Sequence, residues 1–251
     1  MFHGRAGSAG LAAIAVAGVS CLAATACGGT TAASLTATPR ASSTADPLAG
    51  LSASKVVAEA TADAGAAPSL TIAGTVSQQQ GQTAIIHLGI KRGLGCTGSV
   101  GLGSEGSVKL ILIDKTVYLD PDKQFWTANA GANANAVIAL VNGRYIKVPA
   151  SDKNAAPLAD LCNVSKLIDT GNSTYTKEAV TTLDGKRVLA IKDDKGSTGY
   201  VTDTSKPEYV EITAPKGDKN GSGEVMISVG APVTLAAPPA SDVIDGTTLG
   251  V

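Results

Sequence analysis

The middle of the chain alternates between hydrophobic and polar positions in short runs. Residues 69–76 alternate in this way, and in the next run Ala84, Ile86, Leu88 and Ile90 fall on one side. A period of two is typical of β-strands that bury one face. Further runs follow closely, at 95–102, 107–113 and 116–119. Because the turns between the runs are too short for parallel crossovers, the pattern predicts an antiparallel meander.

Helical periodicity precedes and interrupts these strands. Apolar residues recur at helical spacing over 48–60, ahead of Gly65 and Pro68, which predicts a first helix. We expect further helices at 132–141 and 155–168, with a strand at 144–148 between them. Alternation then returns at 174–181, 186–192, 197–203, 208–213 and 223–229. The order predicts an α+β fold: one curved antiparallel sheet, a half-barrel, with helices packed on its concave face.

One parity of the strand residues is apolar and forms the predicted core. Phe125 and Trp126 form the one cluster of adjacent aromatic residues. We expect them either to fill the core beneath a helix or to form the wall or mouth of a cavity. Parity alone does not decide which side chains would face an open cavity. The apolar cavity candidates are Ile86, Leu88, Leu110, Leu112, Val117, Leu119, Trp126, Leu189, Ile191, Val225 and Ile227.

The N-terminal segment has a different pattern. Arg5 precedes an apolar run over 11–19, and small residues follow as far as Cys27. A basic start, an apolar stretch and small residues before a cleavage point are typical of a secretory signal peptide. The run is too short and too rich in Ala and Gly for a membrane-spanning helix, and no basic cluster follows it. We therefore expect residues 1–26 to be a signal peptide that is removed.

The segment Ala24-Thr-Ala-Cys27 resembles the lipobox of bacterial lipoproteins, in which the cysteine is acylated and becomes the new N-terminus. Ala24 stands where Leu is usual, and Cys21 is a poorer candidate because Gly18 takes that position. Two acyl chains, such as palmitate, give stable anchorage. Residues 27–47, rich in Thr, Ala and Ser, are then a lipidated flexible linker. The resemblance implies a chain anchored by lipid at the extracytoplasmic face of the cell membrane.

Composition argues against a nucleic-acid partner. Lys and Arg total 20 against 21 for Asp and Glu, so no basic field would attract phosphate groups. Aromatic residues make up 3% of the chain, too few for a surface on which bases stack. We expect no binding of nucleic acid.

Two glycine motifs, at 93–98 and 101–106, have the form G-x-G-x-x-G. A dinucleotide site requires such a motif to leave a strand and open a helix, whose N-terminus binds the phosphates. Strand-like sequence follows both copies here. The glycines are therefore expected to allow bulges and bends in a sheet around a cavity.

Cys96 and Cys162 lie in the globular part, without the CxxC spacing or paired histidines of a zinc site. Outside the cytoplasm two such cysteines commonly form a disulfide. Closing a loop of about 66 residues would stabilise the fold by roughly 4 kcal/mol on the chain-entropy model, and would hold the helical insert against the sheet. Two free buried thiols are the alternative.

No set of residues points to catalysis. His87 lies on the polar side of its strand, and the carboxylate pairs Asp120/Asp122 and Asp193/Asp194 fall at turns, where Asp is favoured locally. No G-x-S-x-G elbow occurs. We expect no enzyme, no cofactor and no metal site.

Several segments together resemble the actinobacterial lipoproteins of the LppX/LprG type. The segments that carry the resemblance are 115–119, the Phe125-Trp126 pair, 142–148, 183–191 and 206–212. The resemblance covers residues from about 50 to 235, and we expect one domain over 48–235. It implies a half-barrel like that of the LolA/LolB carriers, whose sheet and helices enclose an apolar cavity for acyl chains. The tail, 236–251, has no expected function.

These observations favour a membrane-anchored lipoprotein that binds a lipid, an acylated glycolipid or another apolar ligand, for lipid transport or presentation. The alternative is a fully packed envelope module that recruits or regulates a partner and carries an exposed apolar patch. A hydrolase, the third hypothesis, would need a cleft with convergent titratable groups. The identity of the lipid, and of any membrane transporter that acts as a partner, stays open.

Overall fold

The structure, a computed structural model, describes residues 46–77, 83–168, 171–215 and 222–249. The expected signal peptide and the lipidation site Cys27 lie outside the described residues. Leu48 is fully buried in the main hydrophobic cluster, two residues after the described part begins. Packed structure therefore begins where the expected linker ends.

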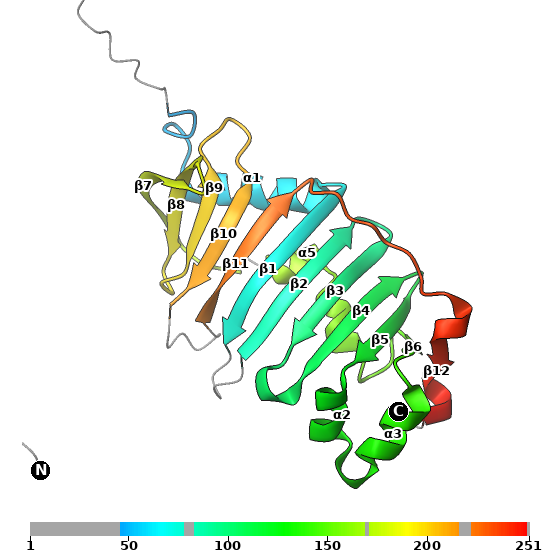
Figure 1. Ribbon diagram of the computed structural model, residues 1–251. Coiled ribbons are helices and arrows are strands. Elements are labelled where there is room, and N and C mark those ends of the chain that lie inside the picture. Colours follow the sequence, from blue (N-terminus) through cyan, green and yellow to red (C-terminus); the bar gives the residue numbers. More distant parts are fainter. Residues whose placement is uncertain (1–45, 78–82, 169–170, 216–221, 250–251) are drawn as a thin grey trace, which may run out of the picture. The chain divides into compact units, whose positions relative to one another are not determined.

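Twelve strands form one open sheet (Figure 1). Its spatial order is β12-β6-β5-β4-β3-β2-β1-β11-β10-β9-β8-β7, so β12 and β7 form the two edges. The strands are β1 (Ser69–Ser77), β2 (Thr83–Lys91), β3 (Gly95–Gly101), β4 (Ser107–Ile113), β5 (Thr116–Pro121), β6 (Tyr145–Pro149), β7 (Tyr175–Leu183), β8 (Lys186–Asp193), β9 (Thr198–Thr202), β10 (Tyr209–Ala214), β11 (Ser222–Val229) and β12 (Val243–Asp245).

Two antiparallel meanders make up most of the sheet. The first runs from β1 to β6 and the second from β7 to β11, and they join where β1 pairs with β11. The expectation of a wholly antiparallel sheet was wrong at one edge, where β12 pairs with β6 in parallel. The sheet is therefore mixed, because part of the tail without an expected function returns to it as a strand.

Five α-helices accompany the sheet in the described part of the chain: α1 (Ala53–Ala66), α2 (Lys123–Asn129), α3 (Ala134–Val141), α4 (Ala156–Asp160) and α5 (Val164–Leu167). Short 3₁₀ turns are η1 (Gly103–Glu105), η2 (Gly131–Asn133), η3 (Ala240–Asp242) and η4 (Gly246–Leu249). The helix expected over 155–168 is instead two short helices, since Asn163 leaves the helical conformation and its side chain accepts the Ser165 N–H to begin α5. Helix α2 was not predicted.

Strand register separates the two faces of the sheet. Residues directly opposite one another in neighbouring strands point to the same face, and the series Ile72, Leu88, Gly98, Leu110 and Leu119 crosses five strands in this way. The same register places all the strand candidates on that side, which we call the inner face. The pattern of alternation was therefore sufficient to assign one face of the sheet.

The inner face is covered at its centre by helices. Val56 and Ala60 of α1 belong to one hydrophobic cluster with Leu70 and Leu110 of the sheet, and Ile168, just after α5, joins the same cluster. Figure 1 shows α1 and α5 behind the sheet. The main core thus lies between the inner face and these two helices.

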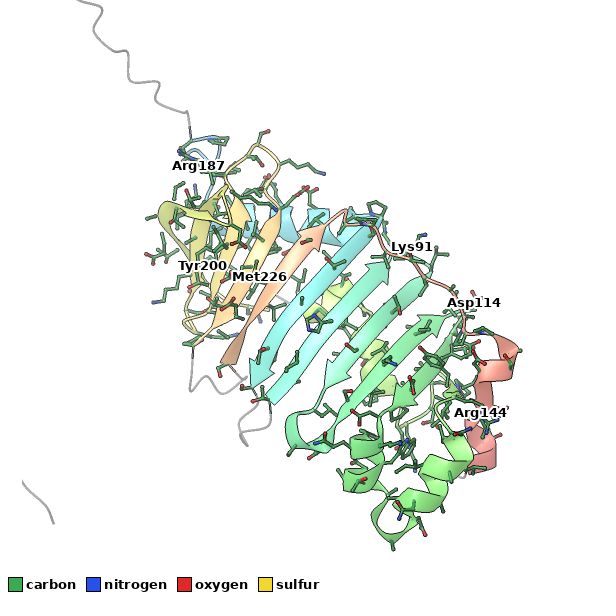
Figure 2. The ribbon with its side chains drawn as sticks, viewed as in Figure 1. Lys91, Asp114, Arg144, Arg187, Tyr200 and Met226 are labelled. Carbon is green, nitrogen blue, oxygen red and sulfur yellow. A yellow bond between two sulfur atoms is a disulfide. The ribbon has the colours of Figure 1, made fainter. Side chains whose placement is uncertain are left out.

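The outer face is crossed by the segment that follows β11 (Figure 1). Gly89 of β2 faces outward, and a Cβ there would lie 3.0 Å from Cγ1 of Val233. Figure 2 views this same face, on which Tyr200 and Met226 lie. The glycine lets the segment pass close to the strand on its way to β12.

A buried carboxyl group on β10 gives a pH-dependent prediction. Glu211 is only 7% exposed, and burial, followed by repulsion from Glu224 and Asp184, raises its pKa. A raised folded-state pKa gives stability that is fully present below the unfolded value, about 4.3 for Glu, and is lost as pH rises through the folded value. We expect Glu211→Gln to raise the free energy of unfolding at pH 7.5 but not at pH 4, by urea denaturation.

The exposed Glu178 provides a matched control. Glu178→Gln removes the same charge from the chain, so it separates the effect of burial from that of net charge. An equal gain for Glu211→Gln at both pH values would contradict the assignment.

Candidate functional site

An apolar pocket of about 600 Å³ lies on the inner face, between strands β3–β6 and helices α2, α3 and α4. This volume is within the range of small-ligand sites, about 300–1,000 Å³. We call it the apolar pocket, and its lining includes Val100, Val108, Leu119, Phe125, Trp126 and Val137.

Helix α2 is fixed over the sheet by Asp122. One carboxylate oxygen accepts the Phe125 N–H at 2.7 Å, which caps α2, and the other accepts the Ser107 N–H at 2.9 Å and its hydroxyl at 2.8 Å. Burial acts to raise the pKa of Asp122, but the hydrogen bonds from Phe125 and Ser107 outweigh it and lower the pKa below its ordinary value. The ionised side chain therefore ties α2 to the start of β4.

Gly106 makes this close approach possible. Its φ is +89°, and a Cβ would lie 2.4 Å from the backbone nitrogen of Phe125. Only glycine accepts both the backbone conformation and the contact. The second glycine motif thus serves packing, and strand β4 follows it where a nucleotide site would need a helix.

Two aromatic rings form one wall of the apolar pocket. Phe125 and Trp126 stand edge to face, with ring centroids 5.5 Å apart and an interplanar angle of 83°. Both are half-buried. Trp126 also packs against the second hydrophobic cluster, which includes Val117 and Val141. Trp126 therefore contacts the core and lines the pocket at once, which combines the two alternatives that the sequence left open.

A disulfide holds α4, which also lines the apolar pocket, against the sheet. Cys96, fully buried on β3, is bonded to Cys162, with Cα atoms 5.5 Å apart. This is the pair expected from the sequence. Because Cys162 follows α4 directly, the bond fixes α4 over the inner face, where Ala155 and Leu158 line the apolar pocket.

A second pocket, of about 660 Å³, lies on the other side of α4, and we call it the edge pocket. Leu70, Ile90 and Leu112 lie at its base, but charged side chains surround it, namely Lys91, Arg92, Asp114, Lys115 and Asp160. Figure 2 shows Lys91 and Asp114 on the same side of the sheet, where β2 and β4 end. The apolar pocket, whose lining includes one charged residue, Asp152, is the better candidate for hydrocarbon.

The cavity candidates divide into two groups. Leu119 and Trp126 line the apolar pocket. Leu88, Leu110, Leu189, Ile191 and Ile227 are buried in the main cluster, and Ile86, Leu112 and Val225 pack against it. Val117 is buried in the second cluster. Most candidates are thus packed core.

Several lining residues were missed from the sequence. Val100, Val108 and Ile146 have the same parity as the candidates, so alternation would have found them. Phe125 was recognised as aromatic but not as part of a helix. Val137 of α3 carried no signal, since its role depends on how α3 sits over β5 and β6.

The residues considered for catalysis or metal binding lie apart in the described part of the chain. No group of three or more His, Cys, Asp or Glu side chains in that part of the chain is placed to hold a metal ion. His87 is exposed on the outer face. Asp193 accepts the N–H groups of Lys195 and Ser197 within its own turn. None of the described helices has the length and apolar character needed to cross a membrane.

The fold is similar to that of several solved structures. LprF from Mycobacterium bovis matches over 74% of this chain and 96% of that chain, with a TM-score of 0.50 and 14% identity. An uncharacterized conserved protein from Thermus thermophilus matches over 77% and 98%, with a TM-score of 0.38 and 8% identity. A LolA superfamily protein from Nitrosomonas europaea matches over 76% and 97%, with a TM-score of 0.25 and 9% identity. The last two scores are too low to support an argument.

The LprF likeness confirms the resemblance to proteins of the LppX/LprG type at the level of fold. The class defined by this fold is therefore one of open, many-stranded sheets with a few helices. No protein-family model and no curated protein matches the sequence.

Proposed function

We propose that this protein is a non-enzymatic, extracytoplasmic lipoprotein that holds acyl chains of a lipid in the apolar pocket, for lipid transport or presentation. The observation that carries the proposal is the pocket itself, an apolar hollow of about 600 Å³ between the sheet and three helices. A fully packed interaction module would have no such space, so the pocket favours the carrier over that alternative.

The lining suits hydrocarbon. Each methylene group moved from water into such a site contributes about 0.8 kcal/mol, and aliphatic and aromatic walls offer no donors or acceptors that would distinguish one acyl chain from another. Selectivity would come from the polar residues of the lining, among them the exposed Asn133 and Asn154. Amide groups pair well with hydroxyls, so the headgroup of an acylated glycolipid is a suitable match.

Anchorage through Cys27 completes the proposal. Its support is the lipobox-like sequence and the expected linker over 27–47, both inferred from the sequence. An acylated N-terminus would hold the domain at the extracytoplasmic face of the membrane that supplies its ligand.

Trp126 is the only tryptophan of the chain and lines the apolar pocket, so its fluorescence tests the proposal. Dibromostearate, whose bromine atoms quench tryptophan on contact, is expected to quench Trp126 in a saturable manner. Val137→Phe places a larger ring in the same pocket and is expected to weaken this binding at least tenfold. The measurement is a fluorescence titration of the full chain at submicellar concentrations.

Ile85→Phe is the matched control, since Ile85 is 47% exposed on the outer face of β2. It introduces the same aromatic ring away from the pocket and is expected to leave binding unchanged. Quenching that does not saturate, or that is equal in both variants, would remove the assignment of the pocket.

A further inference from the structure

One segment of the chain contains no charged residues. Residues 124–143 contain no Asp, Glu, Lys, Arg or His, in a chain in which 16% of residues are charged. They form α2, η2 and α3. Figure 1 shows α2 and α3 together at one end of the sheet, beyond the ends of β4 and β5. We call residues 124–143 the uncharged tip.

Helix α3 carries apolar side chains on its outward face as well as its inward face, with Asn135 as the one polar residue of the helix. Ala134 and Val141 are buried and Val137 and Ile138 are half-buried, at the spacing of one helical face. The outward face consists of Asn135, Ala136, Ala139 and Leu140. Leu140 is 51% exposed, and is one of three large hydrophobic side chains exposed in the described residues. Three of these four outward residues are apolar, so this face can contact a second apolar phase.

The exposed surface and the apolar pocket lie on opposite sides of the same two helices. Phe125 and Trp126 of α2 and Val137 of α3 line the pocket from within, while Leu140 lies on the outward side of the same helix pair. The two helices therefore separate the pocket from whatever lies against the tip. A ligand that passed between α2 and α3 would move from an apolar phase outside the tip into the apolar pocket.

A basic residue lies at each end of the tip. Lys123 is exposed at its start, and Arg144 at its end donates to the carbonyl oxygens of Leu140 at 2.6 Å and Val141 at 3.1 Å. Figure 2 shows Arg144 at the same end of the sheet as α3. Asp120 pairs with Lys109 at 3.0 Å, whereas the Asp122 carboxylate caps α2 and offsets one of the two flanking cations. An apolar surface bordered by basic groups is complementary to an anionic membrane interface.

We propose that the uncharged tip docks on the lipid bilayer that carries the protein's own anchor, and that α2 and α3 pass the ligand between that bilayer and the apolar pocket. This inference rests on the proposed function. One exposed leucine gives weak insertion, but a linker over 27–47 that behaves as a flexible coil would place the domain on average roughly 25 Å from its anchor. Tethering at that distance makes a weak contact frequent, which suits a site that must also release the membrane.

A fluorophore at position 140 tests the contact in the full mature chain. Leu140→Cys introduces a free thiol, because Cys96 and Cys162 are bonded to each other and Cys27 would be acylated. The labelled protein is reconstituted into phosphatidylglycerol-containing vesicles with brominated acyl chains. We expect at least twofold stronger quenching at position 140 than at position 94, where Leu94→Cys replaces an equally exposed leucine, 54% exposed, in the turn after β2.

Equal quenching at the two positions, or none at position 140, would overturn the proposal. Shielding of position 140 that depends on protein concentration, without quenching by the bilayer, would mean that a second copy covers the tip and would overturn it too. Leu140→Asp separates this proposal from the proposed function. We expect it to slow the transfer of a brominated phospholipid from vesicles to Trp126 at least fivefold, and to leave the binding of dibromostearate from solution unchanged. Unaltered transfer would overturn the docking role, whereas absent binding from solution in the parent chain would overturn the pocket itself.

Discussion

Replacing both Cys96 and Cys162 with alanine is expected to lower the free energy of unfolding by about 4 kcal/mol. The two cysteines are 66 residues apart, and a cross-link over that distance removes much of the conformational freedom of the unfolded chain. Domains of this size are commonly stable by only 5–15 kcal/mol. The loss would therefore be a large part of the total, and guanidinium denaturation of the parent and the variant measures it.

The structure also predicts where this loss appears first. Helices α4 and α5 are short, at five and four residues, and isolated helices of that length are not stable in water. We expect hydrogen exchange to accelerate across residues 156–167 more than in β1 or β2. Reductant should destabilise the parent to the same extent and leave the double variant unchanged. A loss below about 1 kcal/mol would mean that packing alone holds α4 on the sheet.

Leu110→Ala is expected to cost about 3 kcal/mol, whereas Leu119→Ala should cost only about 1 kcal/mol. The two leucines are directly opposite one another in β4 and β5 and share the inner face. Leu110 is fully buried in the main cluster, so its removal leaves a cavity. Leu119 is half-buried and already borders the apolar pocket, so its removal enlarges a space that is already present. Urea denaturation of both variants measures the difference.

This pair tests the pocket without any ligand. The substitution and the face are the same for both leucines, so the difference reports what surrounds each side chain. Equal costs near 3 kcal/mol would mean that the space beside Leu119 is filled by protein.

The inner face of the sheet carries both packed core and an open pocket. The main hydrophobic cluster joins α1 and the residues around α5 to the central strands and to β8–β11, while the apolar pocket lies over β3–β6. The main core and the apolar pocket thus occupy distinct parts of one face, which meet at Val100 and Leu119. The fold can leave part of that face open because the remainder is packed.

The strands were predictable because each depends on local alternation. From β1 to β5 and from β7 to β11 the predicted runs match the observed strands within a few residues. The helices were less predictable. The run over 155–168 has helical composition, but Asn163 breaks it, and α2 begins at Asp122 because this carboxylate binds both Phe125 and Ser107. Strand β12 has too few residues for a pattern, and pairing with β6 alone makes it a strand.

The sequence by itself determined the alternation of the strands, the assignment of one apolar face, and a cysteine pair suited to a disulfide. It did so because side-chain direction along a strand repeats every two residues, whatever the rest of the chain does. Only the tertiary structure decided which apolar residues are solid core and which border a pocket. That distinction depends on where α2, α3 and α4 stand above β3–β6, and therefore on contacts such as those of Asp122 and Cys162 with distant parts of the chain.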